Sequence, residues 1–366
     1  MKKFLILLFY VLITMNVYSQ RITRVEPLNW WVGMKTPFTL MLYGENLCDF
    51  DVSVVEKGIG IKNVRHAESP NYLFVDVSID ADVKAGDYTF ILKKGKTTLK
   101  QKYTLAERRK GSAERKSFTS ADMIYLLMPD RFANGNPDND STNDTTEKAD
   151  RKNMQGRHGG DLQGMIDHLD YIVDLGATAI WSTPLLLDNE PTVSYHGYAC
   201  SDYYHIDPRY GSNELYKTFV TESHKRGLKV IFDIVTNHCG NAHWWIKDLP
   251  YKDWIHQFDK YTPSNHAASL NMDPNASKYD IEIFRNGWFD TIMPDMNLNN
   301  KDLLQYFKQY AIWWIEYADL DGLRVDTYPY NDKIPMSEWC KTLVLEYPNM
   351  NIVGECWTYV KSQLAY

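Results

Sequence analysis

The most constraining feature of this sequence is a change of hydrophobic pattern close to Lys116. Before Lys116, apolar residues occur in short extended runs that glycines separate. After it, apolar runs of strand length alternate with segments of helical periodicity. The first pattern is typical of a β-sandwich, and the second of a parallel sheet with right-handed crossovers. We therefore expect two different domains, for which a length of 366 residues is sufficient.

The first domain is predicted over residues 20–108. Three runs there are rich in β-branched and aromatic residues, at 39–43, 72–77 and 88–92. Short strands at this spacing predict an N-terminal immunoglobulin-like β-sandwich. The charged residues 109–116 follow and are predicted to be a linker.

The second domain is predicted over residues 117–366. Strands are expected at 123–128, 177–181, 228–233, 322–325 and 351–354, and helices at 162–175, 214–226, 303–317 and 337–346. Residues 239–286 break this rhythm and are predicted to form an inserted subdomain. The fold class is therefore α/β, a TIM (β/α)8-type barrel that is incomplete here, with about five strands.

The N-terminus has the pattern of a secretory signal peptide, predicted over residues 1–19. Two lysines precede an apolar run from Phe4 to about Met15, which is shorter than the ~20 residues that a membrane span needs. No membrane span is expected elsewhere, and export across the inner membrane, most simply to the periplasm, is predicted. The net charge is −7 and no basic stripe stands out, so nucleic acid is not expected as a partner.

Polar groups follow three of the predicted strands at the point where each strand ends. Residues 233–238 close the third strand, Gly322–Asp326 contains the fourth, and Gly354–Trp357 closes the fifth. An acidic residue at one strand end is more often a helix cap. Three such segments in succession indicate an active site, because the carboxyl ends of barrel strands are where active sites are built.

These three segments resemble the signature regions of the α-amylase family, glycoside hydrolase family 13. The resemblance covers residues 123–357, and Tyr195–Tyr198 fits it as well. The segment Met293–Asn297 resembles the motif of neopullulanases and cyclomaltodextrinases, and the sandwich before the barrel is similar to the extra domain of that subgroup.

The resemblance implies a retaining mechanism with two carboxylates. Asp326 would attack the anomeric carbon, while Glu355 would give a proton to the leaving oxygen and later take one from water. Arg324 lies two residues before Asp326, on the same face of the strand, and is expected to favour the ionised form of Asp326.

The resemblance also implies a sugar site. His238 would bind ring hydroxyls and Tyr198 would stack on the sugar, with His196 in the same segment. Trp357 would pack against the leaving-group sugar, although a tryptophan of the core is a competing interpretation. The substrate would be an α-glucan oligosaccharide or a cyclodextrin.

A structural Ca²⁺ site is implied by a cluster of oxygen donors, the ligand type that Ca²⁺ prefers. The ligands carried over from the subgroup are Asn134, Asn136, Asn139, Asp140, the Gly159 carbonyl and Asp161. Asn136 stands where that pattern has an aspartate, so one charge is missing. A solvated turn rich in Asn and Asp is the alternative.

The predicted function is hydrolysis of α-1,4-glucosidic bonds in maltodextrins, cyclodextrins or pullulan, an activity in starch degradation. The alternatives are an α-glucan transglycosylase of the same family and a non-catalytic starch-binding protein. The family's fourth signature region, with its third carboxylate, is absent, so the chain as given is expected to be an inactive fragment. Asp295 and Asp202 are the carboxylates to examine in its place. The resemblance allows a homodimer of the full-length form.

Overall fold

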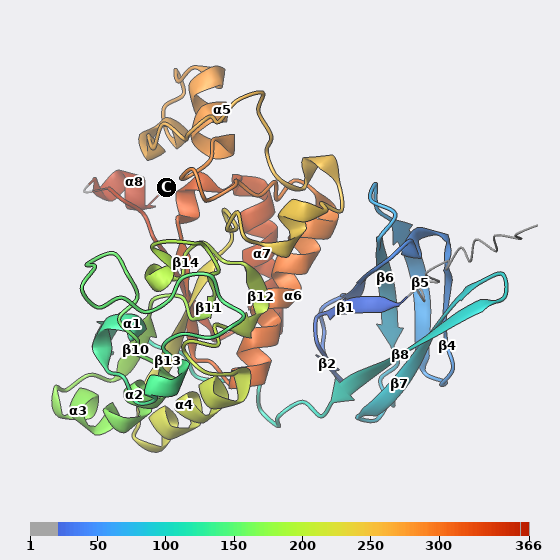
Figure 1. Cartoon of the computed structure of the whole chain (residues 1–366), viewed down its shortest axis with the longest axis horizontal. Helices are drawn as coiled ribbons and strands as arrows, with labels where there is room; N and C mark the ends of the chain where they lie inside the picture. The colour runs from blue at the N-terminus through green and yellow to red at the C-terminus, as the bar shows by residue number, and fades with distance from the viewer. Residues whose placement is uncertain (1–20, 359, 366) are drawn as a thin grey trace, which may run out of the picture.

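The computed structural model describes residues 21–358 and 360–365 (Figure 1). The predicted signal peptide, residues 1–19, lies outside the described residues. Within the described part of the chain, no helix is long and apolar enough to cross a membrane.

Two four-stranded sheets form the N-terminal domain, and they pack face to face as a β-sandwich. One sheet has the order β1-β3-β6-β5 and the other β2-β8-β7-β4, and every pairing except β2–β8 is antiparallel. The strands are β1 (Ile22–Glu26), β2 (Trp30–Trp31), β3 (Phe38–Gly44), β4 (Asp51–Val54), β5 (Ile59–His66), β6 (Tyr72–Ile79), β7 (Gly86–Lys94) and β8 (Thr97–Ala106). The core between them contains Phe38, which stacks on Trp30 at 5.3 Å and on Tyr103 at 5.5 Å between ring centroids. The predicted sandwich is confirmed.

A parallel five-stranded sheet with the order β15-β14-β13-β10-β9 forms the second domain. Its strands are β9 (Ile124–Leu127), β10 (Ala179–Ser182), β13 (Lys229–Val235), β14 (Gly322–Asp326) and β15 (Asn351–Gly354). The helices of this domain are α1 (Pro129–Phe132), α2 (Leu162–Asp167), α3 (Leu169–Asp174), α4 (Asn213–Lys225), α5 (Lys278–Asn286), α6 (Lys301–Ala318), α7 (Lys333–Glu346) and α8 (Lys361–Ala365). Strands adjacent in the sheet follow one another in the chain, which is the order of a TIM barrel, partial here.

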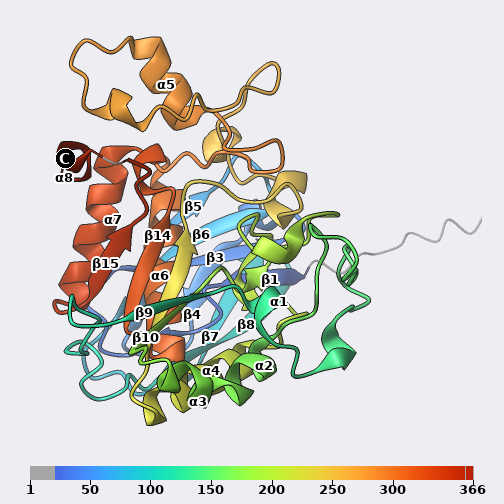
Figure 2. The same ribbon diagram turned by 90° about the vertical axis from the view of Figure 1, so that its left-hand side faces the viewer.

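Between β13 and α6 the chain contains α5 and several short 3-10 helices. Figure 2 shows α5 and its flanking loops standing apart from the sheet, above α7 and α8. A hydrogen bond from the Cys239 amide to the Pro294 carbonyl, 3.2 Å long, joins the two ends of this segment. A short antiparallel hairpin of β11 (Leu186–Leu187) and β12 (Asp202–Ile206) lies between β10 and α4.

Two details of the second domain differ from the prediction. Residues 123–128 are apolar throughout, which predicts a buried strand, but Ile124 is 40% exposed and Leu126 54%, because β9 lies at an edge of the described sheet. The helix expected at 162–175 is divided at His168, whose backbone leaves the helical region while its ring bonds the Gly164 carbonyl at 2.8 Å. The apolar residues keep the same helical periodicity before and after His168, so periodicity alone does not predict the break.

The sandwich packs against α6, which Figure 1 shows on the side of the barrel domain that faces it. The Thr39 backbone and the Gln309 side chain exchange two hydrogen bonds, of 2.5 and 2.8 Å. Trp31 lies against Trp313 with 6.5 Å between ring centroids. Most of the 18 residues of α6 are buried, as expected for a helix that is covered on several sides.

A buried carboxyl group in the contact between the two domains, that of Glu26, has a raised pKa. Glu26 is 1% exposed and accepts a hydrogen bond of 2.8 Å from the Tyr306 hydroxyl. Arg24 bonds both Glu26, at 3.2 Å, and Asp202, at 2.8 Å. Burial, helped by the Asp202 charge, raises the pKa of Glu26 to about 7, against the opposing effect of Arg24.

We expect the contact between the domains to weaken as the pH rises from 5 to 8. A carboxyl group with a raised pKa binds its proton more tightly in the folded state, so its favourable contribution is lost as the pH rises through about 7. Glu26→Gln should reduce this pH dependence of the unfolding free energy by on the order of 2 kcal/mol, measured by urea denaturation. The exposed Glu45→Gln is the control, and an equal pH dependence in all three proteins would contradict the assignment.

Candidate active site

Three neighbouring strands bring the predicted carboxylates to one rim of the sheet. Asp233 on β13 pairs in register with Arg324 on β14, and Val325 pairs with Gly354 on β15, directly before Glu355. Arg324 and Asp326 lie two residues apart and therefore on the same face of β14. The charged residues lie at the ends of separate strands in the sequence. They come close together in the structure because parallel strands align their carboxyl ends.

The guanidinium of Arg324 is the centre of this arrangement. Its Nη1 lies 2.9 Å from Oδ1 of Asp233 and 2.7 Å from Oδ1 of Asp326, and its Nη2 lies 2.7 Å from Oε1 of Glu355. The side chain of Arg324 is 6% exposed. We call these four residues the charge cluster. One cation meets three carboxylates in a nearly water-free setting, where a charge without a partner is costly.

Asp233 is fully enclosed by donors. Its Oδ2 accepts hydrogen bonds from the indole of Trp181 at 2.9 Å and from the hydroxyl of Tyr198 at 3.2 Å. Burial raises the pKa of Asp233 to about 6, although the Arg324 charge and these donors oppose the shift. Asp233 therefore orients Arg324 and Tyr198 through hydrogen bonds.

The environment of Asp326 contains opposing influences. Burial and the nearby Asp233 charge raise the pKa of Asp326, and Arg324 acts in the opposite direction. Arg324 lies where the sequence predicted and, as expected, favours the ionised form of Asp326, although burial and the Asp233 charge outweigh it. A further donor is the hydroxyl of Thr327, 3.2 Å from Oδ2 of Asp326.

Glu355 is the most accessible member of the charge cluster, with a side chain that is 20% exposed. Its Oε2 accepts a hydrogen bond of 2.9 Å from the Thr327 amide, and its Oε1 one of 2.7 Å from the indole of Trp357. A small pocket beside it is lined by Phe289, Thr327, Tyr330, Glu355 and Trp357. Trp357 is 73% exposed, so the interpretation as a core tryptophan is wrong.

The predicted sugar-binding residues lie around the same rim. Tyr198 has its ring 5.8 Å from the Arg324 guanidinium carbon. His196 accepts a hydrogen bond of 2.9 Å from the Tyr198 amide through Nδ1. His238 is 1% exposed and stacks on Phe289, and its Nε2 has no hydrogen-bond partner among the described residues. Burial lowers the pKa of His196 to about 4 and that of His238 to about 3, so both rings are neutral at pH 7.

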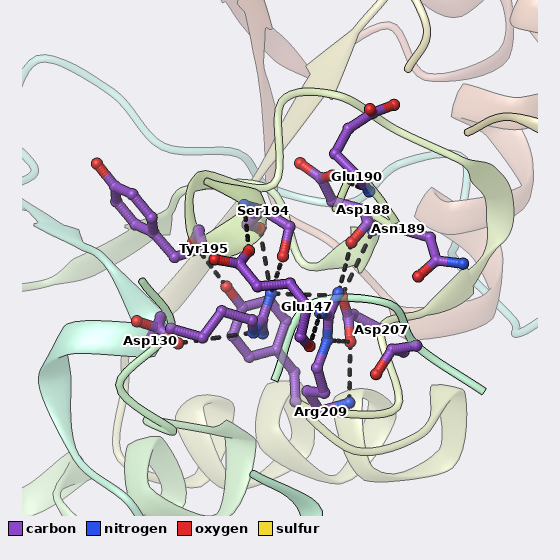
Figure 3. Close-up of polar contacts among 12 residues, drawn as sticks. Asp130, Glu147, Asp188, Asn189, Glu190, Ser194, Tyr195, Asp207 and Arg209 are labelled. Atoms are coloured by element: carbon purple, nitrogen blue, oxygen red, sulfur yellow. Dashed lines mark hydrogen bonds and ion pairs between the residues drawn. The ribbon is translucent and has the colours of Figure 1, made fainter. Parts of the chain in front are cut away.

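A buried ionic network holds the loop that carries His196 and Tyr198 (Figure 3). The carboxylate of Glu147 accepts the amides of Val193 at 3.2 Å and Ser194 at 2.7 Å. Arg157 donates to the Ser194 carbonyl at 3.1 Å. Arg209 binds the Glu147 carbonyl at 3.0 Å and forms a two-point ion pair with Asp207.

Neither this network nor the aromatic wall of the pocket could be predicted from the sequence. The members of the network come from distant loops without a common pattern, so no local signal could have grouped them. Phe289 and Tyr330 lie in segments without regular periodicity, and only their contact with each other, at 5.3 Å between ring centroids, shows their role as a wall.

Asp202 and Asp295 lie outside the charge cluster. Asp202 pairs with Arg24 of the sandwich at 2.8 Å and with His205 at 3.0 Å. Asp295 binds Nδ1 of His256 at 2.6 Å, and burial raises the pKa of Asp295 to about 7. Neither carboxylate contacts Arg324, Asp326 or Glu355, so the structure does not support either as a third carboxylate of the site.

The predicted Ca²⁺ ligands lie close together in two adjoining loops. Among the described residues, Oδ1 of Asn134 and Oδ1 of Asn139 are buried without a hydrogen-bond partner, and such oxygens are suitable ligands for a cation. Asp140 lies against Gly159, where an added Cβ would come within 2.5 Å of its Oδ1. The carboxylate of Asp161 accepts three backbone amides, those of residues 135, 136 and 164.

The donor set therefore fits a hard cation bound mainly by amide and carbonyl oxygens. Among the described residues, no group of three or more His, Cys, Asp or Glu side chains could hold a metal ion. The loop site contains only two such side chains, Asp140 and Asp161, and therefore does not form a group of this kind.

Comparisons with known proteins match both domains. The family described as "Alpha amylase, catalytic domain" matches residues 126–358, and the family described as "Cyclomaltodextrinase, N-terminal" matches residues 24–109. An intracellular maltogenic amylase of Bacillus subtilis is 32% identical over 240 residues, which are 64% of this chain and 37% of that protein. A cyclomaltodextrinase of Thermoanaerobacter pseudethanolicus is 32% identical over 247 residues, which are 66% of this chain and 40% of that protein.

Among solved structures, an α-amylase of Anoxybacillus superposes with a TM-score of 0.56 at 35% identity, covering 66% of this chain and 49% of that chain. The chain spans 37% and 40% of the length of the two curated relatives.

Replacement of Arg324, the positive charge at the centre of the charge cluster, tests the cluster without any assay of activity. Arg324→Met leaves the buried carboxylates without a partner, which should destabilise the fold by about 3 kcal/mol at pH 8. The loss should be smaller at pH 4.5, because protonated carboxyl groups no longer repel one another. Urea denaturation at both pH values measures the effect, and Arg226→Met, which removes the two surface ion pairs with Asp170 and Glu222, should change little. Equal destabilisation by Arg324→Met at both pH values would contradict the model of competing charges.

Proposed function

Because this chain belongs to the α-amylase family and carries the N-terminal domain of cyclomaltodextrinases, we propose that the protein hydrolyses α-1,4-glucosidic bonds in maltodextrins, cyclodextrins or pullulan. The names of its relatives, a maltogenic amylase and a cyclomaltodextrinase, support this substrate class. Since the chain covers 37% and 40% of those relatives, the activity is proposed for the protein to which these residues belong.

The observation that carries the proposal is the contact of two carboxylates with one guanidinium. Asp326 and Glu355 each lie 2.7 Å from a nitrogen of Arg324, and therefore close to each other. Retaining glycosidases need the two carboxyl groups only about 5–5.5 Å apart, so that one attacks the anomeric carbon directly. The shared contact with Arg324 is compatible with that separation, and the retaining mechanism is proposed from the resemblance to the α-amylase family.

In the proposed first step, Asp326 attacks the anomeric carbon and Glu355 protonates the leaving glucosyl oxygen. The roles are those that the resemblance to the α-amylase family implies; in the structure Glu355 lines the pocket and Asp326 is 5% exposed. The reaction needs the proton on Glu355 and a negative charge on Asp326, which Arg324 stabilises at 2.7 Å. In the second step Glu355 takes a proton from water, and the resulting hydroxide displaces Asp326 from the sugar.

The surrounding residues are proposed to bind the reacting sugar. The ring of Tyr198 offers a flat apolar face, and its hydroxyl is fixed by Asp233 at 3.2 Å. His238 has a neutral ring, and its Nε2 has no hydrogen-bond partner in the described part of the chain, so it can bind a sugar hydroxyl. Trp357, exposed beside Glu355, is placed to contact the leaving-group sugar.

We also propose that Asn134, Asn136, Asn139, Asp140, Gly159 and Asp161 hold a structural Ca²⁺. The cation would satisfy the buried amide oxygens of Asn134 and Asn139. Asp161 accepts the Gly164 amide at the start of α2, so the cation would tie this loop pair to the first helices of the barrel.

The two carboxylates are distinguished by the leaving group of the substrate. Asp326→Asn and Glu355→Gln should each reduce hydrolysis of maltoheptaose by several orders of magnitude. An aryl α-maltoside with a good leaving group needs no proton, so it should restore the first step in Glu355→Gln and leave Asp326→Asn inactive. The release of the aryl group in the first turnover measures this difference, and equal rescue of both variants would show the roles to be misassigned.

The calcium proposal predicts a shift of the thermal midpoint. A ligand that binds only the native state stabilises it by about 2.7 kcal/mol at a free concentration of 100 Kd, so Ca²⁺ should raise the midpoint and EDTA should lower it. Asn139→Ala removes one of the two partnerless oxygens and should weaken the response to Ca²⁺. Asn153→Ala, in the next loop, is the matched control. An unchanged midpoint at saturating Ca²⁺ would count against the site.

A further inference from the structure

Thr327, the residue after Asp326, has an unusual backbone conformation. Its φ is 44° and its ψ is 37°, in the left-handed region, and it is 5% exposed. A β-branched residue in this region is an outlier, because its side chain crowds the backbone. Such strain persists only where the surroundings determine the conformation.

The contacts of the Thr327 backbone show what fixes it. Its carbonyl accepts the Tyr330 amide at 3.0 Å and Nδ2 of Asn331 at 3.4 Å. Asn331 is itself held by the hydroxyl of Thr236, after β13, at 3.2 Å. The turn after β14 is therefore anchored to the neighbouring strand on one side.

On its other side Thr327 contacts both members of the proposed catalytic pair. Its amide donates to Oε2 of Glu355 at 2.9 Å, and its hydroxyl donates to Oδ2 of Asp326 at 3.2 Å. The left-handed backbone turns the amide away from the direction of β14 and toward the carboxylate that follows β15. One strained residue thus spans the two carboxylates opposite their shared contact with Arg324.

We propose that Thr327 is a positioning residue that fixes the nucleophile and the proton donor relative to each other. The proposal rests on the proposed function and adds a residue to it. The hydroxyl of Thr327 lies at the carboxylate oxygen of Asp326 that Arg324 leaves unbound, and a donor there favours the ionised nucleophile. The titratable groups that face Asp326 are Arg324 on its own strand, Asp233 on β13, Glu355 after β15, Tyr198 and Tyr330.

The test compares Thr327→Val with Thr327→Ser. Valine keeps the shape and the β-branch and removes the hydroxyl, whereas serine keeps the hydroxyl. For Thr327→Val, kcat/KM for maltoheptaose should fall on the order of 10- to 100-fold at pH 5, mainly through kcat, since hydrogen bonds to charged groups are strong. The acid limb of the pH profile should move upward by about one pH unit, because Asp326 loses a donor to its ionised form. Thr327→Ser should restore the limb.

Thr183→Val is the matched control. Thr183 follows β10 at the same rim and is 6% exposed, and its buried hydroxyl has no hydrogen-bond partner among residues 21–358 and 360–365. Loss of this hydroxyl should leave the pH profile unchanged. A merely structural role for Thr327 would lower activity at every pH without moving the acid limb, and that result would overturn the proposal.

A second measurement does not depend on turnover. In the protein labelled with ¹³C at the aspartate carboxyl groups, the signal of Asp326 is identified by its loss in Asp326→Asn. Its titration midpoint should rise in Thr327→Val and return in Thr327→Ser, and equal midpoints would overturn the proposal. Absence of any glucan hydrolysis by the full-length protein to which these residues belong would contradict the proposed function alone, and the titration would still decide the role of Thr327.

Discussion

The charge balance around Arg324 is the constraint on which the rest of the site depends. A single guanidinium bonds Asp233, Asp326 and Glu355, each within 2.9 Å. Two of these carboxylates are almost inaccessible to water, so they cannot lower their energy by hydration. The cluster must therefore be stabilised by donors from its neighbours or by a proton. Trp181, Tyr198, Thr327 and Trp357 supply those donors, which explains why these polar groups surround the rim.

Much of the barrel domain and the centre of its site could be predicted from sequence. Apolar runs such as Lys229–Val235 are long enough to identify a strand, and period 2 places Arg324 and Asp326 on one face. Because parallel strands align their carboxyl ends, Asp233, Asp326 and Glu355 were expected at one rim, and the structure brings them together there. The roles proposed for Asp326 and Glu355 came from resemblance to a family and are still predictions.

The remaining features depend on contacts between distant residues or on burial, neither of which local pattern reports. The exposure of Ile124 and Leu126 follows from the place of β9 in the sheet, which its own sequence does not encode. The network of Glu147, Arg157 and Arg209 joins loops whose order in the chain says nothing about their proximity. The role of Thr327 could not be predicted, because a threonine gives no local sign of a left-handed backbone.

The burial of α6 has a consequence for how this architecture can change. The helix lies between the sandwich and the sheet. It presents apolar or aromatic residues on both sides, such as Trp313 toward the sandwich and Trp314 toward the sheet. Loss of the sandwich would expose Trp313 and the buried Gln309 to water, on a helix that also packs against β13. The N-terminal domain is thus part of the barrel's own core. A lineage could lose it only after α6 had acquired a polar outer face, so the two parts are expected to be inherited together.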